Sequence, residues 1–143
     1  MTDYTIISKY RNKDACERLV KELEARSKSC YNFCAKPANL DCPTASPDEQ
    51  MNALEQTQNF FQDPYIRKIF EVDLAGLKNA ETVIMLLPAG TSVHMEAGIA
   101  YGLGKRLILI GEPEKPETLY LIFEERYPTI EAFLEHLDSL VQR

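Results

Sequence analysis

Residues 82–110 read TVIMLLPAGTSVHMEAGIAYGLGKRLILI, and they predict a strand, a helix and a second strand in direct succession. Residues 82–87 are almost continuously apolar, which is typical of a strand buried on both faces of a parallel sheet. A polar turn precedes a helix over residues 92–103, and Gly104 is well placed to end it. Residues 107–110 form the next apolar strand. Two strands joined through a helix make a βαβ unit, so this stretch predicts an α/β fold.

The sequence before this unit continues the alternation of strands and helices. Residues 4–7 form a β-branched first strand, residues 15–23 carry apolar side chains at helical spacing, and residues 30–33 are a weaker strand. Two further helices are expected to begin at Ser46 and Asp63, because each of these capping residues is followed by proline. The first should run to about residue 61 and the second to about residue 78.

The sequence after the unit supplies the last elements. Residues 119–123 are apolar and fit either a strand or a helix, and residues 129–141 have one apolar face and predict a closing helix. Residues 34–46 are rich in Pro, Asn, Ala and Thr, so we expect a long loop there. The chain therefore predicts one doubly wound domain over residues 1–143, with a four- to five-stranded, mostly parallel sheet and helices on both faces.

Composition restricts the partners of the protein. The net charge is −6, from 16 basic and 22 acidic residues, and the lysines and arginines are scattered. Nucleic-acid polymers attract clustered positive charge, so we do not expect one as a partner, whereas a small nucleotide stays possible. The longest strongly apolar run, residues 83–88, is too short to cross a membrane. The first residues lack the pattern of a secretory signal, so a cytoplasmic location is expected.

The four cysteines do not predict a metal site. Cys16 lies on the apolar face of a predicted helix, whereas the spacing of Cys30, Cys34 and Cys42 matches no zinc pattern and no histidine is near. We therefore expect free thiols, no metal and no cofactor.

Glu96 is the first candidate for chemistry. Ligands of parallel α/β sheets bind outside the carboxyl ends of the strands, which places the site at residues 8–13, 34–46, 88–92 and 111–117. Glu96 is expected in the first turn of the helix that follows residues 88–92. Free backbone N–H groups and the helix dipole should keep its carboxylate ionised, and should hold an anionic ligand over Gly90, Thr91 and Ser92. A first-turn acid can also stabilise a helix without any function.

Asp73 is the second candidate. It falls on the apolar stripe of its predicted helix, which comprises Ile66, Ile69, Phe70, Leu74 and Leu77. A carboxylate on a buried face is costly unless it is paired or hydrogen-bonded, which favours a functional role. The alternative is that Asp73 sits at the edge of the stripe and is solvated.

Three further side chains are candidates for ligand contact. His94 lies near a helix start, so we expect a neutral imidazole that forms hydrogen bonds, although a surface role is an alternative. After the first strand, Arg11 could bind a phosphate or carboxylate and Tyr10 could stack on a base. A solvated loop is the alternative for these two residues.

A family resemblance connects these candidates. The patterns DLxxLxxAxxVxxLL over residues 73–87 and ExGxAxGxGK over residues 96–105 resemble the nucleoside 2-deoxyribosyltransferase-like superfamily, which includes deoxyribosyltransferases and 2′-deoxynucleoside 5′-phosphate N-hydrolases. The first strand and the following residues 8–12 are also similar to members of this group. The resemblance covers about residues 4–111 and implies a flavodoxin-like fold.

The resemblance also implies roles for individual residues. Glu96 would be the nucleophile at an N-glycosidic bond, and Asp73 would bind the sugar or activate the leaving base. Gly90 and Ser92 would contact the sugar or its 5′ group, and Ser8 and Gly98, which lie in matching segments, are also expected to contact the substrate. Family members often complete the site from a neighbouring subunit, so a homodimer or larger homo-oligomer is implied. The transferases carry an acid and the hydrolases a serine where this chain has Gly90, which leaves the base, the sugar and the 5′ group open.

Three hypotheses follow for the function. The first is an enzyme that cleaves or transfers the N-glycosidic bond of a (deoxy)nucleoside or nucleotide. The second is a non-catalytic module that binds or senses a nucleotide on the same fold. The third is a nucleoside monophosphate phosphoribohydrolase, because residues 88–91 resemble the Pro-Gly-Gly-x-Gly-Thr turn of that class, although Glu96 comes two residues late.

Overall fold

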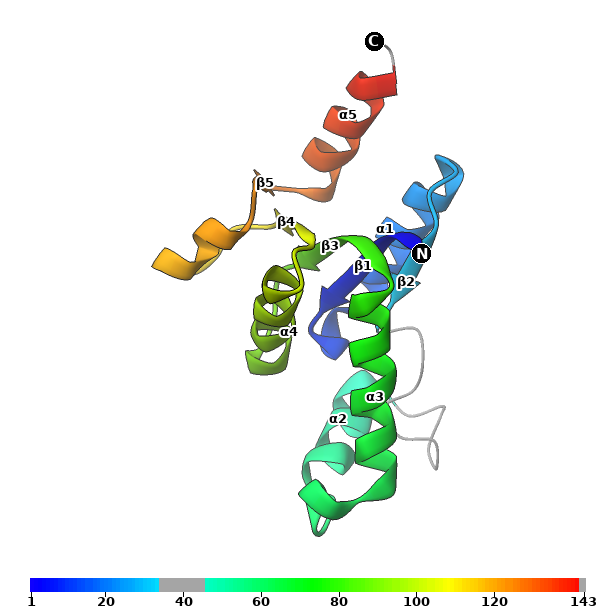
Figure 1. Ribbon diagram of the computed structural model, residues 1–143, viewed down its shortest axis with the longest axis vertical. Helices are drawn as coiled ribbons and strands as arrows, with labels where there is room; N and C mark the ends of the chain where they lie inside the picture. Colours follow the sequence, from blue (N-terminus) through cyan, green and yellow to red (C-terminus); the bar gives the residue numbers. More distant parts are fainter. Residues whose placement is uncertain (34–45, 142–143) are drawn as a thin grey trace.

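The computed structural model describes residues 1–33 and 46–141, and its centre is a five-stranded sheet (Figure 1). The strands are β1 (Thr2–Ser8), β2 (Cys30–Asn32), β3 (Ala80–Leu86), β4 (Arg106–Ile110) and β5 (Glu125–Tyr127). Their order in the sheet is β2-β1-β3-β4-β5, and every neighbouring pair is parallel. The predicted α/β class with a parallel sheet is confirmed.

Helices connect the strands and agree largely with the predicted positions. The α-helices are α1 (Lys13–Ala25), α2 (Pro47–Glu55), α3 (Pro64–Lys78), α4 (Thr91–Gly102) and α5 (Ile130–Val141). Short 3₁₀ helices are η1 (Tyr10–Asn12), η2 (Phe60–Gln62) and η3 (Thr118–Ile122). The ambiguous residues 119–123 therefore fall mostly in η3. The prediction that the helix after Ser46 reaches residue 61 is wrong, because the chain leaves α2 after Glu55 and turns at Asn59, which has a left-handed backbone.

Two buried clusters show that the sheet is doubly wound. On one face, side chains such as Ile6 and Ile84 pack with residues of α1 and α5. On the other face, Ile7 and Met85 pack with Leu77 of α3 and with the buried side of α4. This alternation of neighbouring residues between the two faces is the ordinary consequence of strand geometry. The α3 and α4 face is the one that concerns the candidate site.

The capping residues predicted from the sequence start α2 and α3. Ser46 accepts a hydrogen bond from the Glu49 amide, and Asp63 accepts from the Tyr65 and Ile66 amides. The first half of α3 extends past the sheet beside α2, as Figure 1 shows. The predicted apolar stripe of α3 is consequently buried only in part.

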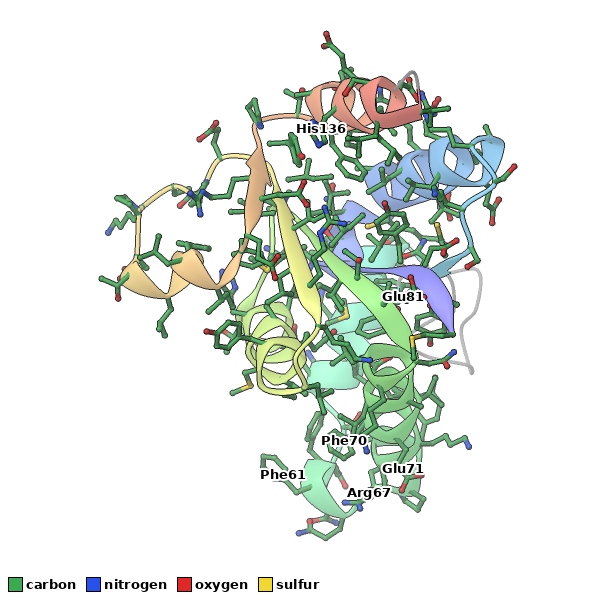
Figure 2. The ribbon with its side chains drawn as sticks, turned by 45° about the horizontal axis from the view of Figure 1, so that its top comes forward. Phe61, Arg67, Phe70, Glu71, Glu81 and His136 are labelled. Atoms are coloured by element: carbon green, nitrogen blue, oxygen red, sulfur yellow. The ribbon has the colours of Figure 1, made fainter. Side chains whose placement is uncertain are left out.

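The exposed end of α3 places Asp73 at the border of the core. Phe70 is 50% exposed and Phe61 is 91% exposed at the end away from the sheet (Figure 2), whereas Leu77 is 1% exposed. Asp73 lies between Phe70 and Leu77 along the helix and is half-buried. Its carboxylate thus sits where α3 leaves the sheet. Within the described residues, no helix is long and apolar enough to cross a bilayer.

Candidate active site

Glu96 of α4 is a half-buried residue, and one of its two carboxyl oxygen atoms is fully buried. Its Oε2 atom is inaccessible to solvent and, among the described residues, has no hydrogen-bond partner. Burial, and secondarily the negative charge of Asp73, raises the pKa of Glu96 to about 8. Both effects act in the same direction, because each disfavours the charged form. Glu96 is therefore mostly protonated at pH 7 in the unliganded protein.

The prediction that Glu96 is ionised at neutral pH is wrong. α4 begins at Thr91 with Gly90 as its N-cap, and its first turn contains no acidic residue. Glu96 lies beyond the first turn, where the helix dipole and the free N–H groups have little effect. Burial decides its protonation state instead.

Asp73 and Glu96 lie on two helices that contact each other, α3 and α4. The charge of Asp73 acts on Glu96, so the structure brings together two candidates that the sequence singled out by separate patterns. Two carboxyl groups in one partly desolvated region resist being ionised together. Such a pair can hold a proton near neutral pH and release it when a ligand or a base arrives.

Tyr31 is a third residue of this region, and the sequence analysis did not identify it. It comes from β2, where it pairs with Thr5 of β1. Burial raises the pKa of Tyr31, and the charges of Asp73 and Glu96 raise it further. The hydroxyl of Tyr31 is therefore within electrostatic reach of both carboxyl groups.

Gly76 allows Tyr31 to approach α3. A Cβ atom at Gly76 would lie 2.8 Å from Cε1 of Tyr31 and 3.0 Å from Cε1 of Phe33, closer than side chains tolerate. A glycine inside a helix is unfavourable for the helix itself, so its presence was a signal of close packing. The sequence does not reveal which side chain fills that space.

Ser8 and Asn12 connect the ends of β1 and β3. The Ser8 Oγ atom lies 2.6 Å from the Leu86 carbonyl oxygen and 3.3 Å from that of Pro88, and Ser8 is 5% exposed. The Asn12 side chain donates to the Ser8 Oγ atom over 3.0 Å. The hydroxyl that was predicted to meet substrate thus holds two strand ends together in the unliganded protein.

Arg11 contacts the protein's own α2. Its Nε atom forms an ion pair with Asp48, and its Nη2 atom donates to the Asn52 side chain over 3.2 Å. Its Nη1 atom lies 4.0 Å from a Glu55 carboxylate oxygen. Tyr10 packs against the cluster on the α1 and α5 face. A ligand phosphate would therefore have to compete with Asp48 for Arg11.

The turn before α4 borders an open hollow. This hollow of about 580 Å³ is lined by Ala89, Gly90, Thr91, His94 and Met95. Thr91 and Ser92 are exposed, and Gly90 makes no side-chain cap, so the helix end is accessible to a ligand. This is the place where the sequence predicted an anionic group.

His94 and Gly98 face away from Glu96. Residues two positions apart on an α-helix are separated by roughly 200° around its axis. His94 Nδ1 lies 2.8 Å from the Gly90 carbonyl oxygen, and Nε2 lies 3.0 Å from the Tyr120 hydroxyl. A Cβ atom at Gly98 would meet nothing within 4 Å, so this glycine does not serve close packing of α4 on the sheet. The structure does not place these two residues with Glu96.

Comparisons with known proteins bear on the fold. No protein-family model matches the chain, and a search of curated proteins finds no match. Among solved structures, the Clostridium botulinum CMP N-glycosidase BcmB is similar, with a TM-score of 0.58 and 19% sequence identity. The similarity covers 96% of this chain and 98% of that chain. It shows that the two chains share a fold. Within the described residues, no cluster of three His, Cys, Asp or Glu side chains could hold a metal ion.

Proposed function

We propose that the protein cleaves or transfers the N-glycosidic bond of a nucleoside or nucleotide, with Glu96 as the nucleophile. The observation that carries this proposal is the Glu96 carboxyl group. Its buried Oε2 atom has no hydrogen-bond partner among the described residues, and the negative charge of Asp73 helps to raise its pKa. Buried titratable groups with strongly altered pKa values are concentrated at functional sites. The fold shared with an enzyme named as a CMP N-glycosidase supports the same class of reaction.

The chemistry proceeds in two displacements. The ionised Glu96 carboxylate attacks the anomeric carbon, the C–N bond breaks, and the base departs with the bonding electrons and takes up a proton from water. The resulting ester between Glu96 and the sugar is then attacked by water, or by a second base in a transfer reaction, which restores Glu96. Asp73 hydrogen-bonds the sugar or the leaving base during these steps.

The 5′ end of the substrate is assigned to the start of α4. Gly90 and Thr91 line the open hollow, Ser92 is exposed in the same turn, and helix N-termini favour anions. Arg11 would assist a 5′-phosphate after exchanging its contact with Asp48, and Tyr10 stands next to it on η1. A nucleoside without phosphate would use only the hydroxyl contacts.

Release of free base tests the proposal directly. Ribo- and deoxyribonucleosides and their 5′-monophosphates, CMP and its deoxy form among them, are incubated with the protein at pH 8 with and without an acceptor base. We expect chromatography to show free base from at least one of them, and a new nucleoside when transfer occurs. The protein with Glu96→Ala is the control and should release none.

A second candidate function is a nucleotide-binding module without catalysis. It is favoured by the protonated state of Glu96 at neutral pH and by the open hollow at α4. A melting temperature that rises with a nucleotide, together with no base release from any compound in the screen, would establish binding in place of catalysis.

We also propose that a second copy of the chain covers the outer face of α4. Met95 and Ile99 of α4 and Leu103 at its C-cap are 65%, 39% and 43% exposed, so apolar side chains lie on the outer as well as the inner side of the helix. Helices that are apolar all round are normally buried. Sedimentation should therefore give a dimer or larger oligomer, and Met95→Glu should weaken it. A wild-type protein that stays monomeric at high micromolar concentration contradicts this proposal.

A further inference from the structure

The buried Oε2 atom of Glu96 needs a hydrogen-bond donor when the carboxyl group ionises. A buried carboxylate without donors is much less stable than one that accepts hydrogen bonds. Asp73 does not meet this need, because an ionised aspartate only accepts hydrogen bonds and repels the second charge. The charge of Glu96 also acts on Tyr31, whose phenol is a donor.

The backbone around Tyr31 fixes the position of its ring. Thr5, the β1 partner of Tyr31, donates its hydroxyl to the Gly76 carbonyl oxygen over 3.0 Å, which ties α3 to this part of the sheet. The space beside Gly76 is filled by the Tyr31 ring, since a Cβ atom there would lie 2.8 and 3.0 Å from its Cε1 and Cδ1 atoms. Gly76 is one helical turn from Asp73, so the ring packs on the part of α3 that carries this carboxylate.

Phe33 restricts the ring from the side. The two ring centroids lie 5.3 Å apart with an interplanar angle of 78°, an edge-to-face arrangement. Such a contact is favourable for aromatic pairs and limits rotation of both rings. Tyr31 is thus held by a strand, a helix backbone and a second ring, and the charges of Asp73 and Glu96 act on its hydroxyl.

We propose that Tyr31 is a positioning residue of this site, whose hydroxyl donates a hydrogen bond to the Glu96 carboxylate when Glu96 is ionised. The proposal rests on the proposed function for its catalytic meaning, because it orients the nucleophile. No proton is transferred, since the phenol keeps its hydrogen. The raised pKa of Tyr31 supports this, because the phenol stays protonated across the pH range in which Glu96 loses its proton. The charge of Asp73 on α3 acts on Glu96, and the charge of Glu96 acts in turn on Tyr31 of β2.

Tyr31→Phe tests the donor while retaining the ring on Gly76. We expect the midpoint of Glu96 ionisation, followed by the carboxyl ¹³C signal in the unliganded protein, to move up by about one pH unit. The rising limb of the kcat/KM profile should move with it, and kcat on its plateau should fall about tenfold. Gly76→Ala, which displaces the same ring, should move the midpoint in the same direction. Tyr101→Phe, which removes an exposed hydroxyl from α4, is the control and should leave it unchanged.

The carboxyl ¹³C signal tests the role of Tyr31 separately from the proposed function, because it reports the ionisation of Glu96 and does not depend on base release. An unchanged Glu96 midpoint in Tyr31→Phe overturns the role of Tyr31, whatever the activity. A midpoint that moves up in a protein that releases no base from any nucleoside or nucleotide supports the hydrogen bond and removes the proposed function. A large loss of kcat with no movement of either midpoint or profile would show a merely structural effect and also overturn the proposal.

Discussion

Glu96→Gln is expected to abolish base release, with kcat at least about 10³-fold below that of the unchanged protein. The amide has nearly the shape of the protonated carboxyl group, so the packing between α3 and α4 should persist. It cannot form the ester with the anomeric carbon. A 2-fluoro sugar analogue should accordingly add mass to the unchanged protein at Glu96 and add none to the variant. Full turnover in Glu96→Gln would remove Glu96 as the nucleophile.

The same variant should be more stable than the unchanged protein at pH 8. The pKa of Glu96 is about 8 in the folded protein, against an ordinary value of 4.5. Below the ordinary value Glu96 is protonated in both states, so it contributes no difference. Between the two values the unfolded chain releases the proton and the folded chain does not, so the free energy of unfolding falls by about 1.4 kcal/mol per pH unit. The fall stops above pH 8.

Glutamine carries no such dependence. Urea unfolding should therefore give a free energy of unfolding a few kcal/mol higher for Glu96→Gln at pH 8, an order-of-magnitude figure, and nearly equal values at pH 4. Glu81→Gln, at an exposed position of β3 (Figure 2), is the matched control and should show no such gain. Equal stability of Glu96→Gln and the unchanged protein at pH 8 would contradict the buried, protonated state of Glu96. Greater stability with lost turnover is a combination that simple unfolding of the variant cannot produce.

The fold was largely predictable because its signals are local. Residues 82–110 carry the strand, helix and strand pattern in one stretch, and the caps at Ser46 and Asp63 mark helix starts directly. β5 was not predicted, because Glu125 and Arg126 give it no apolar run. It exists because its backbone pairs with β4, which is a tertiary interaction.

The site was predictable only in part, because its environment comes from packing. Asp73 was visible as a charge on an apolar stripe, but the raised pKa of Glu96 depends on two helices lying together. Tyr31 meets Gly76 across a large separation in sequence, and a single sequence carries no signal for such a pair. The contact of Arg11 with α2 was predictable to an intermediate degree. Asp48, Asn52 and Glu55 share one helix face, which the sequence shows only once Arg11 is known to lie against it.

Activity is expected to depend steeply on pH, with kcat/KM rising about tenfold per pH unit below pH 8 and levelling above it. The sign follows from the role of Glu96. The nucleophile acts only when ionised, and the raised pKa of about 8 leaves a small ionised fraction at pH 6. The rise from pH 6 to pH 8 should therefore be about 50-fold. A profile that is flat across this range would contradict the proposed nucleophile.

Asp73→Asn should move this rising limb to lower pH. The negative charge of Asp73 raises the pKa of Glu96, so removing that charge makes Glu96 easier to ionise. The plateau should fall at the same time, because the asparagine no longer serves the sugar or the leaving base as the carboxylate does. Asp14→Asn, which alters an exposed aspartate of α1, should change neither the limb nor the plateau. A limb that stays in place in Asp73→Asn would show that the two carboxyl groups are not coupled in solution. If the rising limb moves to lower pH in Asp73→Asn and to higher pH in Tyr31→Phe, both neighbours must act on the same ionising group. A general loss of structure would not displace the limb in opposite directions.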